Sequence, residues 1–405
     1  MMTIDEQVEY LMQGVDYGDP AVEQAMAVEL RERLIEAERD GRPLQVYCGY
    51  DPTSTDLHLG HTVTMRKLRQ FQELGHEVTF LIGIFTSLIG DPSDKDKLRP
   101  QMSIEKVMHN AETYAQQAFR VLDPEKTKVR YNSEWLSKLS MEDFFRLASN
   151  FTVQQFLTRD NFRKRWDNAE PIYLHEFFYS LMQGYDAHHL NADVQVGGSD
   201  QLFNIMTAAR KLMTFFGQKP NIGIILGILP GTDGEVRMSK SLGNHIPLNT
   251  NAEDMYGKVM SIPDKVMPVY ARLATDWTPE ALNHFLTGLE TNSMHPRDAK
   301  MKLAHAITSV FYGEEAAINA QNQFIAMFQK GDMPDEMPEY KLEGAVSLLD
   351  VMVNNKLAQS RNQARRLIEQ QGVKIDGVTV GDVTLMIDQP CVLQCGKRHY
   401  LRILR

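Results

Sequence analysis

The sequence predicts an α/β fold, with an open parallel sheet followed by a helical domain and a small α+β domain. Residues 78–85 and 222–229 are continuously apolar runs of strand length, as expected for strands buried on both faces of a parallel sheet. Helical patterns separate these runs. After Pro247 the strand signal stops and the periodicity is helical, which indicates a second domain.

The first predicted strand, residues 44–47, leads into a turn-rich loop and an abrupt helix start. Residues 1–40 before it have apolar residues at helical spacing. From His61 the pattern is helical again, and Gly75 marks its stop. Two histidines and Gly60 therefore fall where a helix presents unpaired N–H groups, a natural place for phosphate.

Later elements complete the predicted sheet. The run at 78–85 is expected to end in a turn-rich loop, residues 87–95. We expect mainly helices over 103–165, a further helix at 174–191 and a short strand at 193–196 before the second apolar run. Ligands gather at the carboxyl ends of parallel strands, so the loops that follow these strands are candidate binding segments.

The chain is expected to end in a helical domain, a linker rich in Pro, Gly and acidic residues, and a small module. This module has two amphipathic helix patterns followed by short β-like runs. The predicted segments, in chain order, are 1–246, 247–330, 331–340 and 341–405.

Composition indicates an ordinary globular protein, with 43% hydrophobic and 24% charged residues. No run of about 18 apolar residues predicts a membrane span, and the N-terminus lacks a basic secretory signal. Three cysteines do not form a disulfide framework, which favours a reducing cytoplasm. The net charge is −10, yet residues 341–405 carry ten Lys/Arg and six Asp/Glu, or +4. This basic module could bind a polyanion, although a chance fluctuation stays an open alternative.

Two short stretches carry the candidate chemistry. His58 and His61 have no third or fourth ligand nearby, so we predict no metal site and interpret them as hydrogen-bond donors to phosphate. Neither a Gly-x-Gly fingerprint nor a P-loop is present. A second basic element is therefore needed, and Arg237-Met-Ser-Lys240-Ser241 supplies two cations and two hydroxyls. An ordinary solvated loop is the alternative for such a short motif.

Both stretches resemble the signature motifs, written HIGH and KMSKS, of class I aminoacyl-tRNA synthetases. Their order agrees with that class, one after the first strand and one after the last. Within the class, the chain resembles the bacterial tyrosyl-tRNA synthetases over essentially its whole length, in the segments that begin at Tyr47, Ile89 and Gly197. The tail resembles a small RNA-binding domain. The resemblance implies a Rossmann-like catalytic domain, a helical anticodon-binding domain, and a homodimer formed through residues 101–175.

The resemblance also implies the role of each site residue. Tyr179, Gln183 and Asp186 stand at i, i+4 and i+7, so one helix face would present all three. Residues matching Tyr47 and Asp186 bond the tyrosine hydroxyl, and a buried carboxylate would be left unpaired by phenylalanine. The other implied tyrosine-binding residues are Asp91, Tyr179 and Gln183 at the ammonium and Gln201 near the carboxyl group.

ATP would be held by both motifs and the loops beside them. Catalytic contacts to its phosphates are implied for Thr53, His58, His61, Arg237 and Lys240, and Lys95 and Arg99 are placed to assist them. The other implied ATP-binding residues are Cys48, Gly49, Asp51, Gly60, Thr64, Gly198, Asp200 and Ser239. Mg²⁺ is implied together with ATP, although no carboxylate cage is visible in the sequence. RNA contacts are predicted for Arg361, Arg365, Arg366 and Lys374.

Two departures and two alternatives accompany this interpretation. Leu59 replaces an isoleucine, and Arg237 stands where lysine is usual, which keeps the charge and changes its geometry. The related tryptophanyl enzyme is one alternative. Tyr47 and Asp186 argue against it, because an indole has no hydroxyl. A non-catalytic RNA-binding relative is the other, and would be favoured had His58, Lys240 or Asp186 been lost.

Overall fold

The computed structural model describes residues 2–52, 56–93, 103–329, 337–342, 344–396 and 399–404. The chain forms two compact units, Met1–Gln321 and Asn322–Arg405. None of the helices in these ranges combines the length and apolar composition that a membrane span requires.

Five parallel strands form the sheet of the first unit, in the order β3-β2-β1-β4-β5. Their bounds are β1 Gln45–Tyr50, β2 Glu77–Ile82, β3 Thr127–Tyr131, β4 Val194–Gly198 and β5 Ile222–Leu226. From β1 the chain builds outward to β3, then returns to add β4 on the other side of β1. This confirms the predicted Rossmann-like open parallel sheet. Its topological switch point, where such folds bind ligands, lies between β1 and β4.

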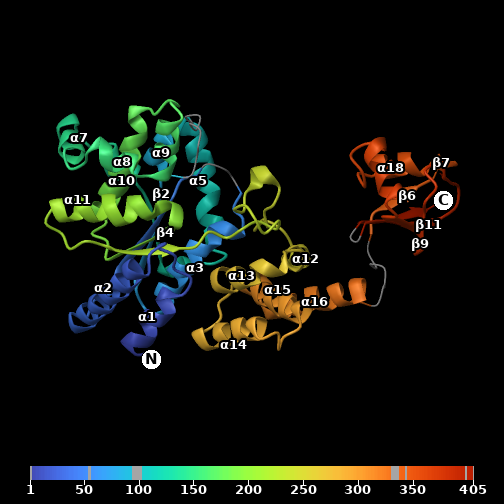
Figure 1. Ribbon diagram of the computed structural model, residues 1–405, viewed down its shortest axis with the longest axis horizontal. Coiled ribbons are helices and arrows are strands. Elements are labelled where there is room, and N and C mark those ends of the chain that lie inside the picture. Colours follow the sequence, from blue (N-terminus) through green and yellow to red (C-terminus); the bar gives the residue numbers. More distant parts are fainter. Residues whose placement is uncertain are drawn as a thin grey trace. The chain divides into compact units, whose positions relative to one another are not determined.

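Helices cover both faces of this sheet (Figure 1). On one face, α3 (Leu59–Glu73) packs against β1, β2 and β4, and α2 (Pro20–Arg39) packs against β5. On the other, α10 (Leu174–His189) and α11 (Arg210–Phe215) share a buried cluster with Tyr47 of β1. The sheet is thus buried on both sides, as its apolar strands predict.

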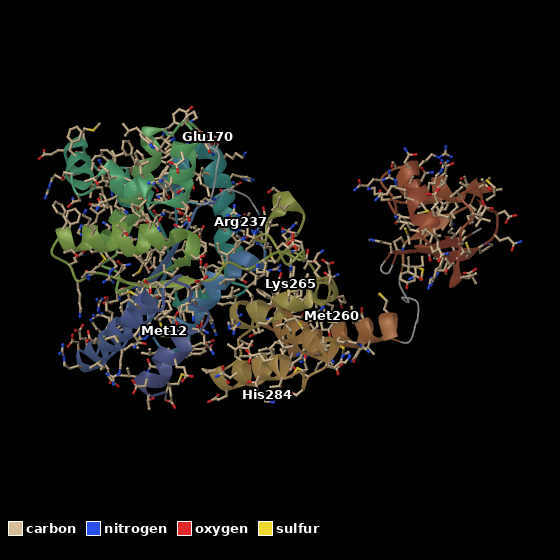
Figure 2. All side chains as sticks on the ribbon, in the orientation of Figure 1. Met12, Glu170, Arg237, Met260, Lys265 and His284 are labelled. Atoms are coloured by element: carbon tan, nitrogen blue, oxygen red, sulfur yellow. The ribbon has the colours of Figure 1, made fainter. Side chains whose placement is uncertain are left out.

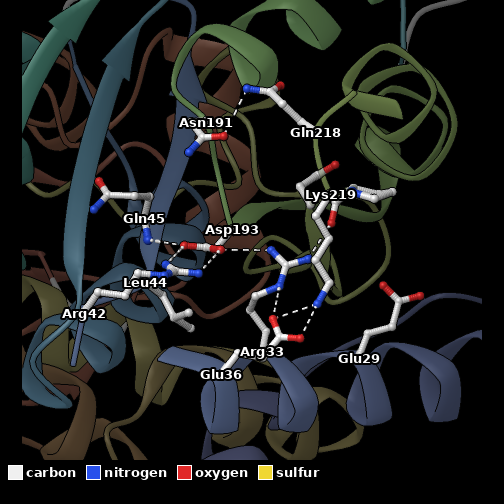
Figure 3. A network of polar contacts seen from close by, with 12 residues as sticks. Glu29, Arg33, Glu36, Arg42, Leu44, Gln45, Asn191, Asp193, Gln218 and Lys219 are labelled. Atoms are coloured by element: carbon white, nitrogen blue, oxygen red, sulfur yellow. Dashed lines mark hydrogen bonds and ion pairs between the residues drawn. The ribbon is translucent and has the colours of Figure 1, made fainter. Parts of the chain in front are cut away.

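At the amino ends of the strands, the buried carboxylate of Asp193 joins three segments (Figure 3). It accepts hydrogen bonds from Arg33 Nη1 at 2.9 Å, Arg42 Nη1 at 2.7 Å and the backbone N–H of Gln45 at 3.0 Å. Burial alone would raise the pKa of Asp193, but these donors hold it below its usual value. The network ties α2 and β1 to the start of β4.

The structure corrects two predicted elements. The strand expected over residues 78–85 ends at Ile82, and Gly83 precedes the short helix α4 (Ile84–Ile89). Apolar composition alone does not separate a buried strand from the buried helix that follows it. The structure also contains β3 within the stretch expected to be mainly helical. This edge strand exposes Lys128 and Tyr131 and is only partly buried elsewhere, so it lacks the apolar signal of a central strand.

The remaining helices of the first unit precede the sheet, follow β2, or follow β5. They are α1 Ile4–Met12, α5 Ile104–Ala118, α6 Ser133–Leu136, α7 Met141–Ala148, α8 Val153–Leu157, α9 Asp160–Asp167, α12 Ala252–Met260, α13 Met267–Ala274, α14 Pro279–Glu290 and α15 Pro296–Tyr312. Helix α16 (Glu314–Gln329) spans the boundary between the two units. The helical texture expected after Pro247 is thus observed.

The second unit is a small α+β module. Its five-stranded sheet has the order β6-β12-β11-β8-β9, and a two-stranded sheet pairs β10 with β7. Helices α17 and α18 bury Leu348, Val351, Ala364 and Ile368 in its core. The element bounds are β6 Glu339–Lys341, β7 Val346–Ser347, α17 Leu348–Asn354, α18 Arg361–Glu369, β8 Val373–Ile375, β9 Val378–Thr379, β10 Met386–Ile387, β11 Cys391–Cys395 and β12 His399–Leu404.

Candidate active site

A cavity of about 540 Å³ opens at the carboxyl ends of the strands, beside the switch point. It brings together segments from β1, α3, α10, β4 and the loop after β5. The sequence-predicted residues that line it are Tyr47, Cys48, Gly49, Asp51, His58, Gly60, His61, Thr64, Asp91, Tyr179, Gln183, Asp186, Gly198, Asp200, Gln201, Arg237, Ser239 and Lys240. Thr53, Lys95 and Arg99 lie outside the described residues.

Backbone pairing holds the two signature stretches together. The segment after the second stretch runs beside the loop before α3, with His58 and Pro247 forming an antiparallel bridge. Leu59 N donates to the carbonyl of Ile246 at 2.9 Å, and Leu248 N donates to that of Leu57 at 3.0 Å. Stretches far apart in sequence therefore share one wall of the cavity.

The rings of the two histidines lie side by side at the start of α3, tilted by 42° to one another. Their ring centroids lie 3.9 Å apart, and the backbone N–H of His58 donates to His61 Nδ1 at 3.2 Å. Burial lowers the pKa of His58 to about 2, with a contribution from His61, and burial lowers the pKa of His61 to about 4. Both rings are neutral at pH 7, so they can act as hydrogen-bond donors without carrying charge. The bond to Nδ1 of His61 leaves its proton on Nε2.

Glycine at position 60 keeps open the space beside His58. A Cβ added there would lie 3.1 Å from two atoms of the His58 ring and 3.5 Å from the Cβ of Met238. Any larger residue would push the ring or the second signature stretch away from the cavity. This is a steric reason for glycine at the site, independent of helix propensity.

The second stretch forms a loop that folds back after β5 (Figure 2, Arg237). Met238 N donates to the carbonyl of Leu229 at 3.0 Å, and Asn244 Oδ1 accepts from Ser239 N at 2.8 Å. A short 3-10 turn, Lys240–Leu242, carries Lys240, whose ammonium pairs with Asp56 in the first loop. The loop therefore faces the first signature stretch across the mouth of the cavity.

Tyr47 and Asp186 form the buried end of the cavity. Both are 2% exposed. Two residues that sequence reasoning missed hold the carboxylate, since Trp135 Nε1 donates to its Oδ1 at 2.7 Å and Asn132 Nδ2 to its Oδ2 at 3.3 Å. Burial still raises the pKa of Asp186 to about 8. Asn132 directly follows β3, so recognising that strand would have made it a candidate.

Further carboxylates line the middle of the cavity. Asp51 accepts hydrogen bonds from Tyr179 Oη at 3.0 Å and from Thr86 Oγ1 at 2.8 Å. Opposite, Gln201 Nε2 donates to Asp91 Oδ2 at 2.7 Å. Tyr179, Asp91 and Gln201 are thus already oriented by hydrogen bonds, a preorganisation that favours binding of a charged ligand.

Three buried polar atoms that line the cavity have no hydrogen-bond partner within the described part of the chain. They are Tyr47 Oη, His58 Nδ1 and Gln183 Oε1. Buried polar atoms in folded proteins are nearly always bonded, so unpaired ones grouped in a single cavity indicate a polar ligand. Tyr47 lies at the buried end and His58 in the first signature stretch at the mouth, so a ligand that satisfies both atoms would extend along the cavity.

Residues near β1 contribute shape to the cavity. Burial raises the pKa of the Cys48 thiol to about 12, so it stays protonated and is no nucleophile. Thr64 shares a hydrogen bond of 2.8 Å with Tyr50. A Cβ at Gly198 would lie 2.7 Å from Asp200 Oδ1, so glycine there makes room for that carboxylate.

Groups of three or more His, Cys, Asp or Glu residues able to hold a metal do not occur in the ranges described.

The predicted RNA-binding residues lie in the second unit. Arg361, Arg365 and Arg366 are exposed on α18, and Lys374 is exposed on β8. Arg361 Nη2 pairs with Asp350 at 2.9 Å. The opposite side of α18 is buried, so the basic side chains can only face outward.

A family model described as "tRNA synthetases class I (W and Y)" matches residues 39–329. The chain belongs to this family. A second model, "Tyrosine--tRNA ligase SYY-like C-terminal domain", matches residues 329–403 of this class I synthetase. Both signature stretches and the cavity lie inside the first match.

Curated relatives of the synthetase cover it almost completely. The tyrosine--tRNA ligase of Moorella thermoacetica is 47% identical over 93% of this chain and 91% of its own length. The tyrosine--tRNA ligase of Carboxydothermus hydrogenoformans is 44% identical over 100% of this chain and 99% of its own length.

Solved structures show the same fold. A C-terminally truncated mitochondrial tyrosyl-tRNA synthetase of Aspergillus nidulans, 22% identical, covers 81% of this chain and 95% of its own, with a TM-score of 0.63. The tyrosyl-tRNA synthetase of Archaeoglobus fulgidus, complexed with L-tyrosine and 23% identical, covers 79% and 100%, with a TM-score of 0.60. At these identities the likeness concerns the fold alone.

Proposed function

We propose that the chain is a tyrosine--tRNA ligase. It activates tyrosine with ATP to give tyrosyl-adenylate and pyrophosphate, then transfers the tyrosyl group to the 3′ end of tRNA(Tyr). The observation that carries this proposal is that Tyr47 and Asp186 both lie at the buried end of a cavity whose mouth holds both signature stretches. The names of the curated relatives agree with it.

The buried end selects the amino acid. A hydrogen bond joins the phenol of tyrosine to the Asp186 carboxyl group, and the phenol oxygen accepts from Tyr47 Oη, which supplies the partner that this buried hydroxyl lacks. Phenylalanine would leave the buried Tyr47 hydroxyl unpaired and would form no hydrogen bond with Asp186, so its binding would not compensate the desolvation of these groups. Tryptophan offers a single N–H donor and no acceptor for the Tyr47 hydroxyl, which disfavours the alternative tryptophanyl function.

The middle of the cavity orients the reacting group. Asp91, Tyr179 and Gln183 bind the ammonium of tyrosine, and Gln201 lies beside its carboxyl group. Asp200 and Gly198 take the ribose of ATP, while Gly60 leaves space for the adenine. The two substrates are then bound with their reacting groups in position, so the reaction between them is effectively intramolecular. This positioning is the main source of rate acceleration in such a site.

Activation needs no protein nucleophile. An oxygen of the tyrosine carboxylate bonds to the α-phosphorus of ATP, the bond from that phosphorus to the bridging oxygen breaks, and pyrophosphate leaves with the electron pair. His58 and His61 donate hydrogen bonds to the phosphates, and Lys240 and Arg237 supply positive charge. Donors fixed before the reaction stabilise the negative charge that builds up on the leaving group. A ribose hydroxyl of the tRNA then attacks the tyrosyl carbonyl, and AMP leaves.

Mg²⁺ enters with ATP, bound to its phosphates, as part of the substrate. The described residues of the cavity include no cluster of carboxylates that would hold the ion by themselves. The ion would neutralise phosphate charge, while Lys240 and the histidines provide the protein's own contacts.

The other segments would position tRNA and build the dimer. We propose that residues 247–330 bind the anticodon, that residues 341–405 bind RNA, and that residues 101–175 form a homodimer contact. Large apolar side chains are exposed in the last segment, among them Met141, Phe145 and Trp166. The cytoplasm, where tRNA is charged and free thiols persist, is the proposed location.

ATP–pyrophosphate exchange with the purified protein tests the proposal. Exchange that depends on tyrosine and fails with phenylalanine and tryptophan is the expected result. Exchange with tryptophan and not with tyrosine would establish the tryptophanyl alternative. A complete lack of exchange with any amino acid, together with RNA binding, would support the non-catalytic relative instead.

A further inference from the structure

Arg159, between α8 and α9, carries a buried guanidinium group outside the cavity wall. The residue is 7% exposed, and its Cζ atom lies 5.2 Å and 5.1 Å from the ring centroids of Phe162 and Phe203. No ion pair within the described residues joins it to a carboxylate. Burying a charge without a paired counter-charge is costly, so its retention calls for an explanation.

The guanidinium donates to three side chains. Its Nη2 donates to Ser93 Oγ at 2.7 Å, and its Nη1 to Ser180 Oγ at 3.0 Å and Asn204 Oδ1 at 3.4 Å. These acceptors come from the loop after α4, from α10 and from the segment after β4. The planar guanidinium group has several N–H donors in fixed directions, so it can hold three elements in one arrangement. The single ammonium group of a lysine cannot do this.

Two of these acceptor residues, Asn204 and Ser93, are hydrogen-bonded in turn to residues that line the cavity. Asn204 Nδ2 donates to Gln201 Oε1 at 2.9 Å, and Gln201 Nε2 donates to Asp91 Oδ2 at 2.7 Å. From the other side, Ser93 N donates to Asp91 Oδ1 at 2.8 Å. Both oxygens of Asp91 are therefore fixed by groups that Arg159 holds in place.

A neighbour of Arg159 adds to this hold on the loop. Asn161 Nδ2 donates to the carbonyl of Pro92 at 2.6 Å. The loop that carries Asp91 is thus tied at two successive residues, Pro92 and Ser93, to the start of α9. Without these hydrogen bonds, the position of the Asp91 carboxylate would depend on the turn-rich loop alone.

We propose that Arg159 is a positioning residue that sets Asp91 and Gln201 for the ammonium and carboxyl groups of the amino-acid substrate. The inference rests on the proposed function, since it concerns the same cavity. Apart from Gly198 and Asp200, which neighbour Gln201, the proposed ATP contacts come from elements that Arg159 does not touch. Loss of Arg159 should therefore affect the amino acid much more than the nucleotide. A misplaced carboxylate weakens binding through lost charge-assisted hydrogen bonds.

Arg159→Met and Arg159→Lys test the proposal in ATP–pyrophosphate exchange. For Arg159→Met we expect the KM for tyrosine to rise about tenfold or more, with the KM for ATP changed less than about twofold. Arg159→Lys retains charge but not the fork, so we expect an intermediate KM for tyrosine. Equal rises in both KM values would overturn the proposal.

Arg165→Met is the matched control. Arg165 is a second buried arginine of the same segment, and it pairs with Glu176 at 2.6 Å rather than with the loop of Asp91. Its loss should lower the thermal midpoint at least as much as that of Arg159, with the KM for tyrosine unchanged. If Arg165→Met raises this KM as much as Arg159→Met does, the effect is general destabilisation and the proposal fails.

Ser93→Ala supplies a second variant that keeps the fold. It should raise the KM for tyrosine about threefold alone and add nothing to Arg159→Met, because both act through one network. Additive effects would contradict that network. Wild-type exchange that does not depend on tyrosine would overturn the proposed function. An unchanged KM in Arg159→Met, with tyrosine-dependent wild-type exchange, would overturn this inference alone.

Discussion

Lys240 forms an ion pair with Asp56, a residue 184 positions earlier in the chain. The ammonium belongs to the second signature stretch, and the carboxylate belongs to the loop that leads to the first. In the proposed reaction Lys240 must contact the phosphates of ATP. Asp56 therefore competes with ATP for the same cation.

Replacing Asp56 by Asn should lower the KM for ATP. The side chains are 56% and 44% exposed, and exposed pairs contribute at most about 1 kcal/mol, so we expect a decrease of about two- to fivefold. Pyrophosphate exchange at varied ATP concentrations measures it. The control is Asp254→Asn, which breaks a partly exposed pair with Lys258 outside the cavity. A raised KM in Asp56→Asn would show that the carboxylate assists ATP binding.

Asp186 should make stability depend on pH. Burial raises its pKa from the ordinary 3.8 to about 8, so between these values the folded protein keeps a proton that the unfolded chain has lost. The stabilisation from this proton is fully present below about pH 4 and is lost as pH rises through about 8. Asp186→Asn should remove this loss. Urea unfolding of both proteins from pH 5 to pH 9 measures it, and parallel curves would contradict the assignment.

Asp193→Asn should destabilise the first unit strongly. The variant leaves Arg33, which is 4% exposed, without its full counter-charge, and breaking a buried pair costs about 3–5 kcal/mol. Urea unfolding at pH 7 is the measurement. Asp40→Asn, which disrupts an exposed pair with Arg39, is the control and should change stability by less than about 0.5 kcal/mol. Equal effects in the two variants would disprove the structural role of Asp193.

Phe145→Asp should dissociate the proposed dimer. Phe145 is 65% exposed on α7, within a segment that also exposes Met141 and Trp166. A charge in a buried apolar contact is costly, so sedimentation velocity at micromolar concentration should show dimeric wild-type protein and monomeric variant. Phe215→Asp is the control, since Phe215 is 43% exposed and lies outside that segment. A monomeric wild-type protein would refute the dimer proposal.

Changes in the second unit should weaken tRNA charging and spare tyrosine activation. We expect Arg365→Ala with Arg366→Ala to raise the KM for tRNA about three- to tenfold and to reduce its salt dependence, because each arginine would neutralise a phosphate. The control is Lys356→Ala, which removes an exposed basic side chain of the same unit that is not among the predicted RNA-binding residues. Removal of residues 341–405 should weaken tRNA charging further, again without loss of tyrosine activation. Full charging by the truncated protein would exclude a role for this module.

Much of the site could be predicted from the sequence because its side chains follow short strands and start helices. Tyr47 ends an apolar run, and His58 to His61 open a helix, so local pattern places both at the carboxyl edge of a parallel sheet. The spacing of Tyr179, Gln183 and Asp186 likewise predicts one helix face, and all three line the cavity. Trp135 and Asn132 could not be found in this way. They follow an edge strand that has no apolar signal.

The sequence by itself determined most of the element types, the order of the two signature stretches and the basic character of the tail, since these depend on residues close together in the chain. Tertiary structure alone decided which distant residues meet. The bridge between His58 and Pro247, the pairing of Asp56 with Lys240 and the hold of Arg159 on Ser93 each join separate elements. Such contacts arise from strand order and helix packing, and local periodicity carries no information about them.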